Sequence, residues 1–488
     1  MHPPLSRRHM LGIGTAFVLA PALPRRLYAA APVHTLAATS RTLDIDGRAA
    51  TVFGLVNEVG GAGLILEPGE RFSLRLTNDL AVETLIHWHG QIPPNVQDGV
   101  PGLPSALIAP GGSRDYDFAA RTGTHWMHAH IPLQEMQLLA APLIVRQPSD
   151  ARADRQEVVL LLHDFSFSPP EELMAALGAP MGGMAGMDHD ATMQGMDMTQ
   201  DMPAMDMSAG HDMSGMVMDL NDIAFDAYLT NDRTLADPQI VRVDPGTRVL
   251  LRIINASAAT AYHIDCGALP GQLVAVDGEP VVPRVASGLG LAMAQRLDVE
   301  VTLPREGGAW PILARREGAR DQTGLILATP GAQIRKLPPL TDSAAPAFDR
   351  DLALEGALQS LTPMADRPAD RRHLVTLGGT MQPYRWTIND RTWGDHAPLT
   401  AITGERVELI FRNLSDMAHP MHLHGHVFQV VAIGARRFEG ARRDTVWLPP
   451  KTEVTVALDA GEAARWMLHC HHLPHLQTGM MTELAISA

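Results

Sequence analysis

Apolar and polar residues alternate along three stretches of the chain that share one register. Each stretch begins at a glycine and ends nine positions later at an asparagine: Gly69–Asn78, Gly246–Asn255 and Gly404–Asn413. Alternation with a period of two is typical of a half-buried β-strand, and glycine and asparagine are common turn residues at strand ends. Three copies in one register predict an all-β chain built from three similar β-sandwich domains.

Histidines follow these strands in phase, which supports the repeat. They lie 18, 17 and 18 residues after the three glycines, at His87, His263 and His422. Shifts in composition then predict the boundaries along the 488 residues. We expect an export signal at 1–31, domain one at 32–150, domain two at 151–340, a linker at 341–370 and domain three at 371–488.

The first residues predict an export signal rather than part of the fold. Arg7 and Arg8 precede an apolar run, Leu11–Leu23, and the small residues Ala29–Ala31 offer a cleavage site. The arginine pair resembles the twin-arginine signal that exports folded proteins. A plain secretory signal and an uncleaved anchor are the alternatives. Because no later apolar run is long enough to span a bilayer, we expect a soluble periplasmic protein with no membrane partner in its mature form.

Composition narrows the classes of partner. The formal net charge of −15 argues against nucleic acid or an anionic membrane surface and favours cationic substrates, including metal ions. Pro (37) and Gly (42) are frequent, which fits many short strands joined by turns. The only two cysteines, Cys266 and Cys470, exclude a disulfide framework. We interpret Cys266 as a small buried apolar residue.

Most histidines gather in four clusters. The clusters are His87-Trp-His89-Gly, His125-Trp-Met-His128-Ala-His130, His419-Pro-Met-His422-Leu-His424-Gly-His426, and His469-Cys470-His471-His472 with His475 close behind. On a strand, residues two apart point to the same face, so each His-x-His can hold one metal or bridge two. The first two clusters belong to domain one and the last two to domain three. They can share a site only if these domains meet.

The last cluster indicates which metal binds. Cys470 is followed by His475 and Met480, five and ten residues on, and His419 lies upstream. A thiolate, two imidazoles and a weak thioether form the blue-copper electron-transfer site. His469 and His471 flank the cysteine and should point to the opposite face of the strand. An electron can therefore pass from Cys470 through covalent bonds to whatever these histidines bind.

Together the four motifs resemble the copper motifs of multicopper oxidases, in particular the three-domain bacterial copper-resistance and copper-efflux oxidases, which are laccase-like. The resemblance covers essentially the whole mature chain and implies three cupredoxin-like Greek-key domains. It also implies four copper ions: one type 1, one type 2 and two type 3. The implied ligands are His419, Cys470, His475 and axial Met480 for type 1; His87 and His422 for type 2; His89, His128 and His471 for one type 3 ion; and His130, His424 and His469 for the other.

The resemblance further implies how protons reach the site. Asp98 matches an acidic residue that this family places near the type 2 copper, and we expect it to orient water and relay protons; a plain Asp-Gly turn is the alternative. Some relatives carry a glutamate after the last type 1 histidine, where this chain has Leu476. His125, His426 and His472 are left over and are interpreted as supporting residues. Domain two keeps only His263 and is interpreted as a spacer.

A methionine-rich insertion at 174–219 stands out from the rest of domain two. Twelve methionines lie between Met181 and Met218, among glycines, aspartates and two histidines. Small and acidic neighbours give them little to pack against, so we expect a mobile loop. Thioethers select Cu(I), so the tract is interpreted as gathering extra copper. A flexible low-complexity insertion without a metal role is the alternative.

The sequence thus predicts an oxidoreductase that couples four one-electron oxidations at the type 1 copper to the reduction of O2 to water. The leading substrate is Cu(I), in copper tolerance. Small phenols or aromatic amines, as in a laccase, are the second possibility. The third is a copper-sequestering protein without physiological turnover, although storage would not need a trinuclear cluster. A two-domain nitrite reductase does not fit the three repeats.

Overall fold

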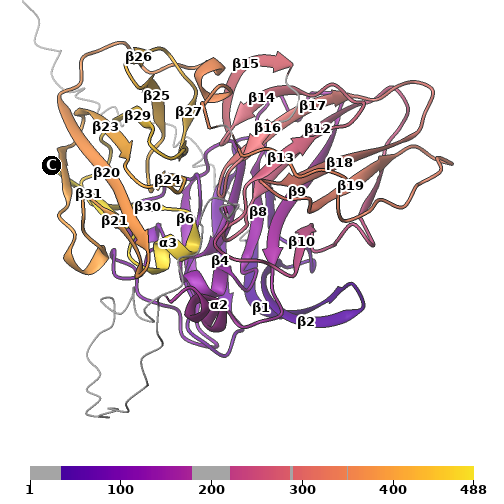
Figure 1. The fold of residues 1–488 in the computed structure, drawn as a ribbon, viewed down its shortest axis with the longest axis horizontal. Coiled ribbons are helices and arrows are strands. Elements are labelled where there is room, and N and C mark those ends of the chain that lie inside the picture. The colour runs from indigo at the N-terminus through magenta and orange to yellow at the C-terminus, as the bar shows by residue number, and fades with distance from the viewer. Residues whose placement is uncertain (1–33, 179–219, 286–288, 349) are drawn as a thin grey trace, which may run out of the picture.

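The computed structural model describes residues 34–178, 220–285, 289–348 and 350–488. Nearly all regular structure is β, as the sequence predicts, and the strands form six sheets arranged as three sandwiches. The first sandwich covers residues 34–145, the second 156–328 and the third 371–487. In Figure 1 the purple strands of the first sandwich lie between the orange and yellow third sandwich and the pink second sandwich.

The first sandwich has two four-stranded sheets, ordered β2-β1-β4-β6 and β3-β8-β7-β5. Its elements are β1 (His34–Ile45), β2 (Arg48–Asn57), β3 (Leu64–Leu66), β4 (Arg71–Asn78), β5 (Ile86–His87), η1 (Asn95–Gln97), β6 (Ser113–Ala119), β7 (Gly123–Ala129), α1 (Pro132–Glu135) and β8 (Ala140–Val145). Buried leucines and aromatic residues from both sheets form its core, among them Phe72, Trp88 and Phe118.

The second sandwich pairs a six-stranded sheet, β10-β9-β12-β17-β14-β15, with a five-stranded sheet, β11-β19-β18-β13-β16. Its elements are β9 (Gln156–Phe165), α2 (Pro170–Ala176), β10 (Ala227–Thr230), β11 (Ile240–Arg242), β12 (Arg248–Asn255), β13 (Tyr262–Asp265), β14 (Gln272–Val276), β15 (Glu279–Val285), β16 (Leu289–Leu291), β17 (Arg296–Thr302), β18 (Ala309–Arg316) and β19 (Gln322–Ala328). The last residues of helix α2 overlap the start of the predicted methionine-rich insertion, 174–219. The rest of that tract, 179–219, lies outside the described residues.

The third sandwich pairs a seven-stranded sheet, β21-β20-β23-β29-β25-β26 with β27 beside β25, with the five-stranded sheet β22-β31-β30-β24-β28. Its elements are β20 (Arg371–Met381), β21 (Tyr384–Ile388), η4 (Trp393–Asp395), β22 (Leu399–Ile402), β23 (Arg406–Asn413), β24 (His419–Leu423), β25 (Phe428–Ile433), β26 (Arg436–Arg437), β27 (Arg442–Arg443), β28 (Thr445–Leu448), β29 (Glu453–Asp459), β30 (Arg465–Cys470), α3 (Leu473–Gln477) and β31 (Met481–Ser487). A short helix, η3 (Glu355–Ala357), lies in the predicted linker.

The repeat in the sequence is a repeat in space. Strands β4, β12 and β23 each pair in parallel with the first strand of their sandwich: β1, β9 and β20. Each of the three ends at the expected asparagine, whose buried side chain donates to a backbone carbonyl four or five residues on and to a second one further along the chain. The asparagine therefore satisfies carbonyls that the turn would leave without a donor.

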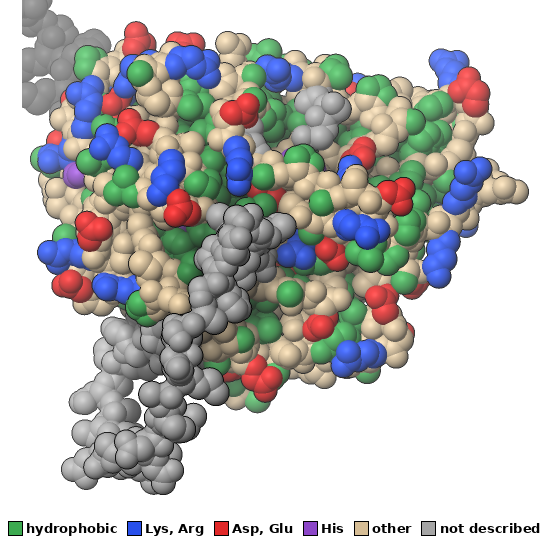
Figure 2. Space-filling view, in the orientation of Figure 1, with side chains coloured by type: hydrophobic (Ala, Val, Ile, Leu, Met, Phe, Trp, Pro, Cys, Tyr) green, Lys and Arg blue, Asp and Glu red, His purple; other side chains and the backbone are tan. Residues whose placement is uncertain are grey.

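The core of the third sandwich extends into the other two. Val100 and Met136 from the first sandwich, and Ala258 and Met293 from the second, join its buried apolar cluster. The three sandwiches are therefore packed against one another. Within the described residues no helix combines the length and apolar content that a membrane crossing demands. On the face drawn in Figure 2, acidic and basic side chains are interspersed.

Candidate metal centre

The four histidine clusters lie at strand ends where the first and third sandwiches meet. His87 in β5 is the register partner of His128 in β7, and His422 in β24 is the partner of His469 in β30. Each strand ends within or just before its His-x-His motif, so the second histidine of every pair lies beyond the strand. The expectation that both members lie on one strand is therefore wrong. The break in the ladder frees the second imidazole to reach a different group of ligands.

The cysteine group belongs to the third sandwich and is closed to solvent. Cys470 Sγ lies 3.7 Å from Nδ1 of both His419 and His475, and these two nitrogens are 3.1 Å apart. All three side chains are buried. His419 donates from Nε2 to Ser415 Oγ at 2.8 Å, and His475 donates from Nε2 to Asp222 at 3.1 Å.

These contacts leave two lone pairs facing each other. Burial lowers the pKa of His419 and of His475 well below its ordinary value, so each ring is neutral and carries one proton. That proton is on Nε2, because Nε2 makes the hydrogen bond. Two Nδ1 acceptors 3.1 Å apart repel each other unless a cation lies between them. Beside a cysteine sulfur, such a cation site suits copper.

Other residues hold this group in place. The Cys470 amide donates to the Met480 carbonyl at 3.1 Å, and the Met480 amide donates to the His475 carbonyl at 3.0 Å. Met480 is fully buried, so the predicted axial methionine is tied to both neighbouring ligands through the backbone. Burial raises the pKa of the Cys470 thiol, and the ionised form therefore needs a bound cation.

A second group joins the two sandwiches and again sets lone pairs against each other. His424 donates from Nδ1 to Asp98 at 2.8 Å, and His469 donates from Nδ1 to the Cys470 carbonyl at 3.0 Å. Their Nε2 atoms then face each other at 3.1 Å. The ring centroid of His130 lies 5.0 Å from that of His424 and 5.3 Å from that of His469, and neither of its nitrogens has a partner.

A third group contains His89, His128 and His471, with one ligand atom of each lying within 4.8 Å of the others. His128 Nδ1 lies 2.8 Å from Glu135, and His89 Nε2 lies 3.1 Å from Asp444. The remaining nitrogens, His128 Nε2 and His89 Nδ1, have no hydrogen-bond partner. Carboxylates behind the rings thus leave the inward nitrogens as acceptors, the arrangement usual for metal-binding histidines.

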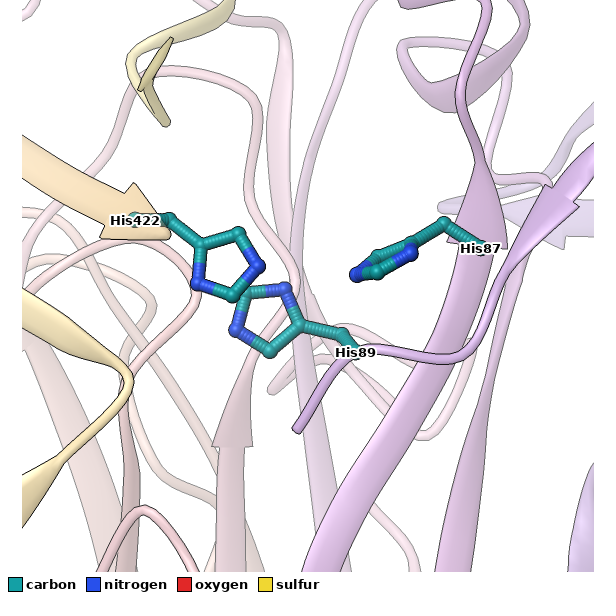
Figure 3. A group of neighbouring side chains, drawn as sticks. All are labelled: His87, His89 and His422. Carbon is teal, nitrogen blue, oxygen red and sulfur yellow. The ribbon is translucent and has the colours of Figure 1, made fainter. Parts of the chain in front are cut away.

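The remaining predicted ligands complete the centre. In Figure 3 the rings of His87, His89 and His422 point toward one another, two from the first sandwich and one from β24. His87 donates from Nδ1 to the Asp98 carbonyl and His422 from Nδ1 to the Asp444 carbonyl, each at 2.8 Å. Both Nε2 atoms are buried without a partner. The structure thus brings eight histidines from the four clusters into one buried centre, while His419 and His475 lie in the cysteine group.

Asp98 links two ligand groups. Its carbonyl accepts from His87 and its Oδ2 accepts from His424, while its Oδ1 is buried without a hydrogen-bond partner, 3.4 Å from His87 Nδ1. The loop can approach β5 only because Gly99 follows. A Cβ there would lie 1.9 Å from the Ile86 carbonyl oxygen, and its φ is +86°. Asp98 therefore lies beside His87 and His424, two histidines that the sequence predicts as ligands of different copper ions.

The histidines left over by the motifs support the site in different ways. His426 donates to the His424 carbonyl at 2.9 Å and accepts from the Gly461 amide. His125 donates to the Thr122 carbonyl at 3.1 Å. His472 stacks on His475, with ring centroids 3.9 Å apart.

The second sandwich contributes more than the spacer that the sequence suggested. His263 lies in β13, away from the histidine centre, and donates to the Pro346 carbonyl. However, Asp222 accepts the hydrogen bond of His475, and Arg296 bonds to Asp444. Cys266 is half-buried against the second core rather than fully buried, and burial raises its pKa to about 11.

Sequence reasoning missed three carboxylates of the centre: Glu135, Asp222 and Asp444. Glu135 lies in α1, and its burial raises its pKa well above the ordinary value. Burial alone would also raise the pKa of Asp444, but the neighbouring Arg296 holds it below the usual range. For Glu135 the only signal in the sequence is that it forms a polar Gln-Glu pair inside the apolar stretch that follows His130. The other two carboxylates belong to sequences that resemble ordinary turns.

The donor groups of the site therefore suit a copper protein, and comparisons with known proteins identify its family. Three sequence models described as multicopper oxidase match residues 37–150, 190–331 and 366–488. Multicopper oxidase MmcO of Mycobacterium tuberculosis is 33% identical over 464 residues, covering 92% of this chain and 86% of the relative. Copper resistance protein A of Escherichia coli is 25% identical over 540 residues, covering 87% and 88%.

Solved structures agree with the fold. The iron-import oxidase Fet3p superposes with a TM-score of 0.72 at 18% identity, covering 93% of this chain and 90% of its own. A metallo-oxidase of Campylobacter jejuni superposes with a TM-score of 0.67 at 19% identity, covering 93% and 91%. The chain belongs to the multicopper oxidase family: it is an oxidoreductase, its sandwiches are cupredoxin-like domains, and its cofactor is copper.

Proposed function

We propose that the protein couples four one-electron oxidations at a type 1 copper to the reduction of O2 to water at a trinuclear cluster. The observation that carries the proposal is the pair of opposed lone-pair contacts, one at His419 and His475 and one at His424 and His469. Each contact needs a cation, and the two contacts are connected through Cys470 and the adjacent His469. Bound copper would supply the one-electron redox chemistry and the O2-reducing centre.

The proposed ligand sets follow the geometry. His419, Cys470, His475 and Met480 would hold type 1 copper, and His87 and His422 would hold type 2. His89, His128 and His471 would hold one type 3 ion, and His130, His424 and His469 the other. Because His469 and His471 flank Cys470 in the chain, the peptide backbone offers the shortest covalent route for electrons between the two sites.

The substrate proposed first is Cu(I), in a copper-tolerance role. His419 and His475 are buried, and Asp222 takes the outward Nε2 of His475. The Trp386 ring covers another side of His475 at 4.1 Å, and Tyr384 donates to Asp222 at 2.6 Å. A bulky phenol cannot reach an imidazole edge enclosed in this way, whereas a carboxylate attracts a small cation. The relatives named for copper resistance support the same role.

The test is O2 uptake by the copper-loaded protein with Cu(I) and, separately, with a substituted phenol. We expect kcat/KM for Cu(I) to exceed that for the phenol by at least about tenfold, roughly 1.4 kcal/mol of transition-state stabilisation. Higher kcat/KM for the phenol would leave the four-copper mechanism in place and make the protein a laccase. Copper binding without uptake with either reductant would instead favour the sequestering role.

Deleting the methionine tract 181–218 tests its proposed role in gathering Cu(I). The tract lies outside the described residues, so the proposal rests on its composition. We expect the deletion to raise KM for Cu(I) several-fold and to leave phenol kinetics nearly unchanged, since thioethers select Cu(I). Steady-state O2 uptake with both reductants measures this. Equal losses for both would contradict the copper-gathering role and favour a plain insertion.

Asp98 is proposed to relay protons to the cluster. One oxygen of its carboxylate accepts from His424, and the other lies beside His87 without a hydrogen-bond partner. Asp98→Asn keeps an accepting oxygen for His424 but cannot carry a proton. We expect kcat to fall by about 10²–10⁴, the usual contribution of a general acid or base, and its pH dependence to change. Full turnover with an unchanged pH profile would exclude the relay. Asp117→Asn, on the exposed side of β6, is the control.

Cellular location remains a proposal from the sequence. The twin-arginine stretch lies outside the described residues. We propose export by the twin-arginine route to the periplasm, because that route carries folded proteins and a chain of three interlocked sandwiches can bind its copper before crossing. Replacing Arg7 and Arg8 with lysine and following the protein by fractionation tests this. Undiminished export would favour a plain secretory signal.

A further inference from the structure

Arg296 is the residue at which all three sandwiches meet beside the metal centre. It opens β17 in the second sandwich, and its side chain is fully buried. Its Nε donates to the Thr124 carbonyl of β7 at 3.1 Å, and its Nη1 donates to Asp444 of the third sandwich at 2.7 Å. Its Nη2 donates to the Asp277 carbonyl at 3.0 Å and also contacts the second oxygen of Asp444. One planar guanidinium thus fixes three segments at once.

Asp444 passes this constraint on to two of the proposed ligands. Its carboxylate lies 3.1 Å from His89 Nε2, which belongs to the first sandwich. Its backbone carbonyl accepts from His422 Nδ1 at 2.8 Å, within the third. The two rings are nearly parallel and their centroids lie 3.8 Å apart. Asp444 therefore sets which nitrogen each ring presents to the centre.

The chain around His89 is fitted to this arrangement. Gly90 follows it with a φ of +86°, and a Cβ at Gly90 would lie 2.6 Å from Arg296 Nη2 and 3.0 Å from Asp444 Oδ2. A side chain at this position would push the guanidinium away from the carboxylate. The glycine of the His-x-His-Gly motif is thus required by the Arg296–Asp444 pair as well as by the turn.

We propose that Arg296 is a positioning residue of the copper cluster, acting through Asp444 to aim His89 and His422. The inference rests on the proposed copper sites and assigns the second sandwich a direct part in assembling them. Arginine suits this role because its planar guanidinium can bond to both oxygens of a carboxylate, which prevents the carboxylate from rotating. Without it, Asp444 can rotate away from His89 Nε2, and the inward Nδ1 loses its fixed direction.

A purely structural salt bridge would have different consequences, and the chain offers a matched control. Arg252 is equally buried: it pairs with Asp150, Glu157 and Asp298, and it donates to the Thr124 hydroxyl of the first sandwich. It contacts no histidine in the interactions that the structure describes. Arg252→Gln therefore removes a comparable buried ion pair without touching the centre, and Arg296→Gln removes the one that touches it.

The experiment compares both variants with the wild type after copper loading. The readouts are copper per protein, blue absorption, the near-ultraviolet absorption of the coupled type 3 pair, and the type 2 electron paramagnetic resonance signal. We expect Arg296→Gln to lose at least half of the type 2 and type 3 signals while keeping the blue absorption, because Cys470, His419 and His475 do not contact Arg296. Arg296→Lys, which keeps the charge and one bond, should recover part of the loss. Arg252→Gln should lose thermal stability only.

Two results would overturn the inference. One is a complete set of type 2 and type 3 signals in Arg296→Gln; the other is an equal spectral loss in both Gln variants. If Arg296→Gln does not fold, Asp444→Asn provides the test. This variant preserves the shape of the side chain and weakens its hydrogen bond to His89. An unchanged type 2 spectrum in Asp444→Asn would contradict the inference. A wild type that binds no trinuclear copper would instead sink the proposed function, so the two failures are distinguishable.

Discussion

Replacing Cys470 with serine is expected to abolish the blue absorption and to lower O2-linked turnover by at least about a thousandfold, roughly 4 kcal/mol in the activation barrier. Serine cannot supply a soft thiolate, and its hydroxyl does not ionise in this buried position. The variant should also lose the proposed covalent electron route, since a serine oxygen would not hold a copper ion placed between His419 and His475. Visible absorption and O2 uptake measure the two effects.

The outcome separates electron input from the O2-reducing cluster. None of the proposed cluster histidines uses the Cys470 sulfur, so the type 2 and type 3 signals should persist in Cys470→Ser. Cys266→Ser is the matched control, because Cys266 is half-buried against the second core and ligates nothing in the described structure. It should keep full colour and full activity. Substantial turnover in Cys470→Ser would show that electrons enter the cluster by another route.

Much of the fold could be predicted from local patterns in the sequence, and the resemblance to multicopper oxidases implied the proposed ligands. The pattern that ends at Asn78, Asn255 and Asn413 repeats because each asparagine side chain donates to a backbone carbonyl of the turn that follows it. The histidine clusters are equally local, since His-x-His at a strand end needs only a few residues. What required the structure was their meeting: clusters hundreds of residues apart in the sequence face each other only after the sandwiches dock.

Two of the three carboxylates that the sequence did not reveal, Asp222 and Asp444, act across sandwich boundaries. Asp444 contacts His89 from 355 positions away, and Asp222 contacts His475 from 253 positions away. Nothing near either aspartate marks it as different from a turn residue. Glu135 is closer to its histidine, but a four-residue helix leaves no periodic signal. Supporting contacts around a metal are therefore the part of such a site that single-sequence reasoning finds least often, although they orient most of the proposed histidine ligands.

Removal of copper is expected to make the protein strongly sensitive to acid between about pH 6.5 and 5. Burial lowers the pKa of eight proposed ligands well below the ordinary value, namely His89, His128, His130, His419, His422, His424, His471 and His475. Unfolded histidine titrates near pH 6.5, so below that pH the unfolded chain binds protons that the fold excludes. Each group then removes up to about 1.4 kcal/mol of stability per pH unit.

The sum is comparable with the free energy of unfolding of a whole domain, about 5–15 kcal/mol, so the apoprotein should lose the native centre within one to two pH units. Five buried carboxyls with raised pKa values act in the opposite direction: Glu135, Asp277, Asp298, Asp164 with a pKa raised to about 6, and Glu317 with a pKa raised to about 7. They bind a proton in the folded state and so stabilise the fold as the pH falls, but they are fewer than the histidines.

Thermal melting of the apo and the copper-loaded protein from pH 8 to pH 5 measures the difference in acid sensitivity. Since copper occupies the lone pairs that protons would take, the loaded protein should keep its melting temperature to a lower pH. Parallel curves for the two forms would mean that the histidines are not the groups that bind the metal.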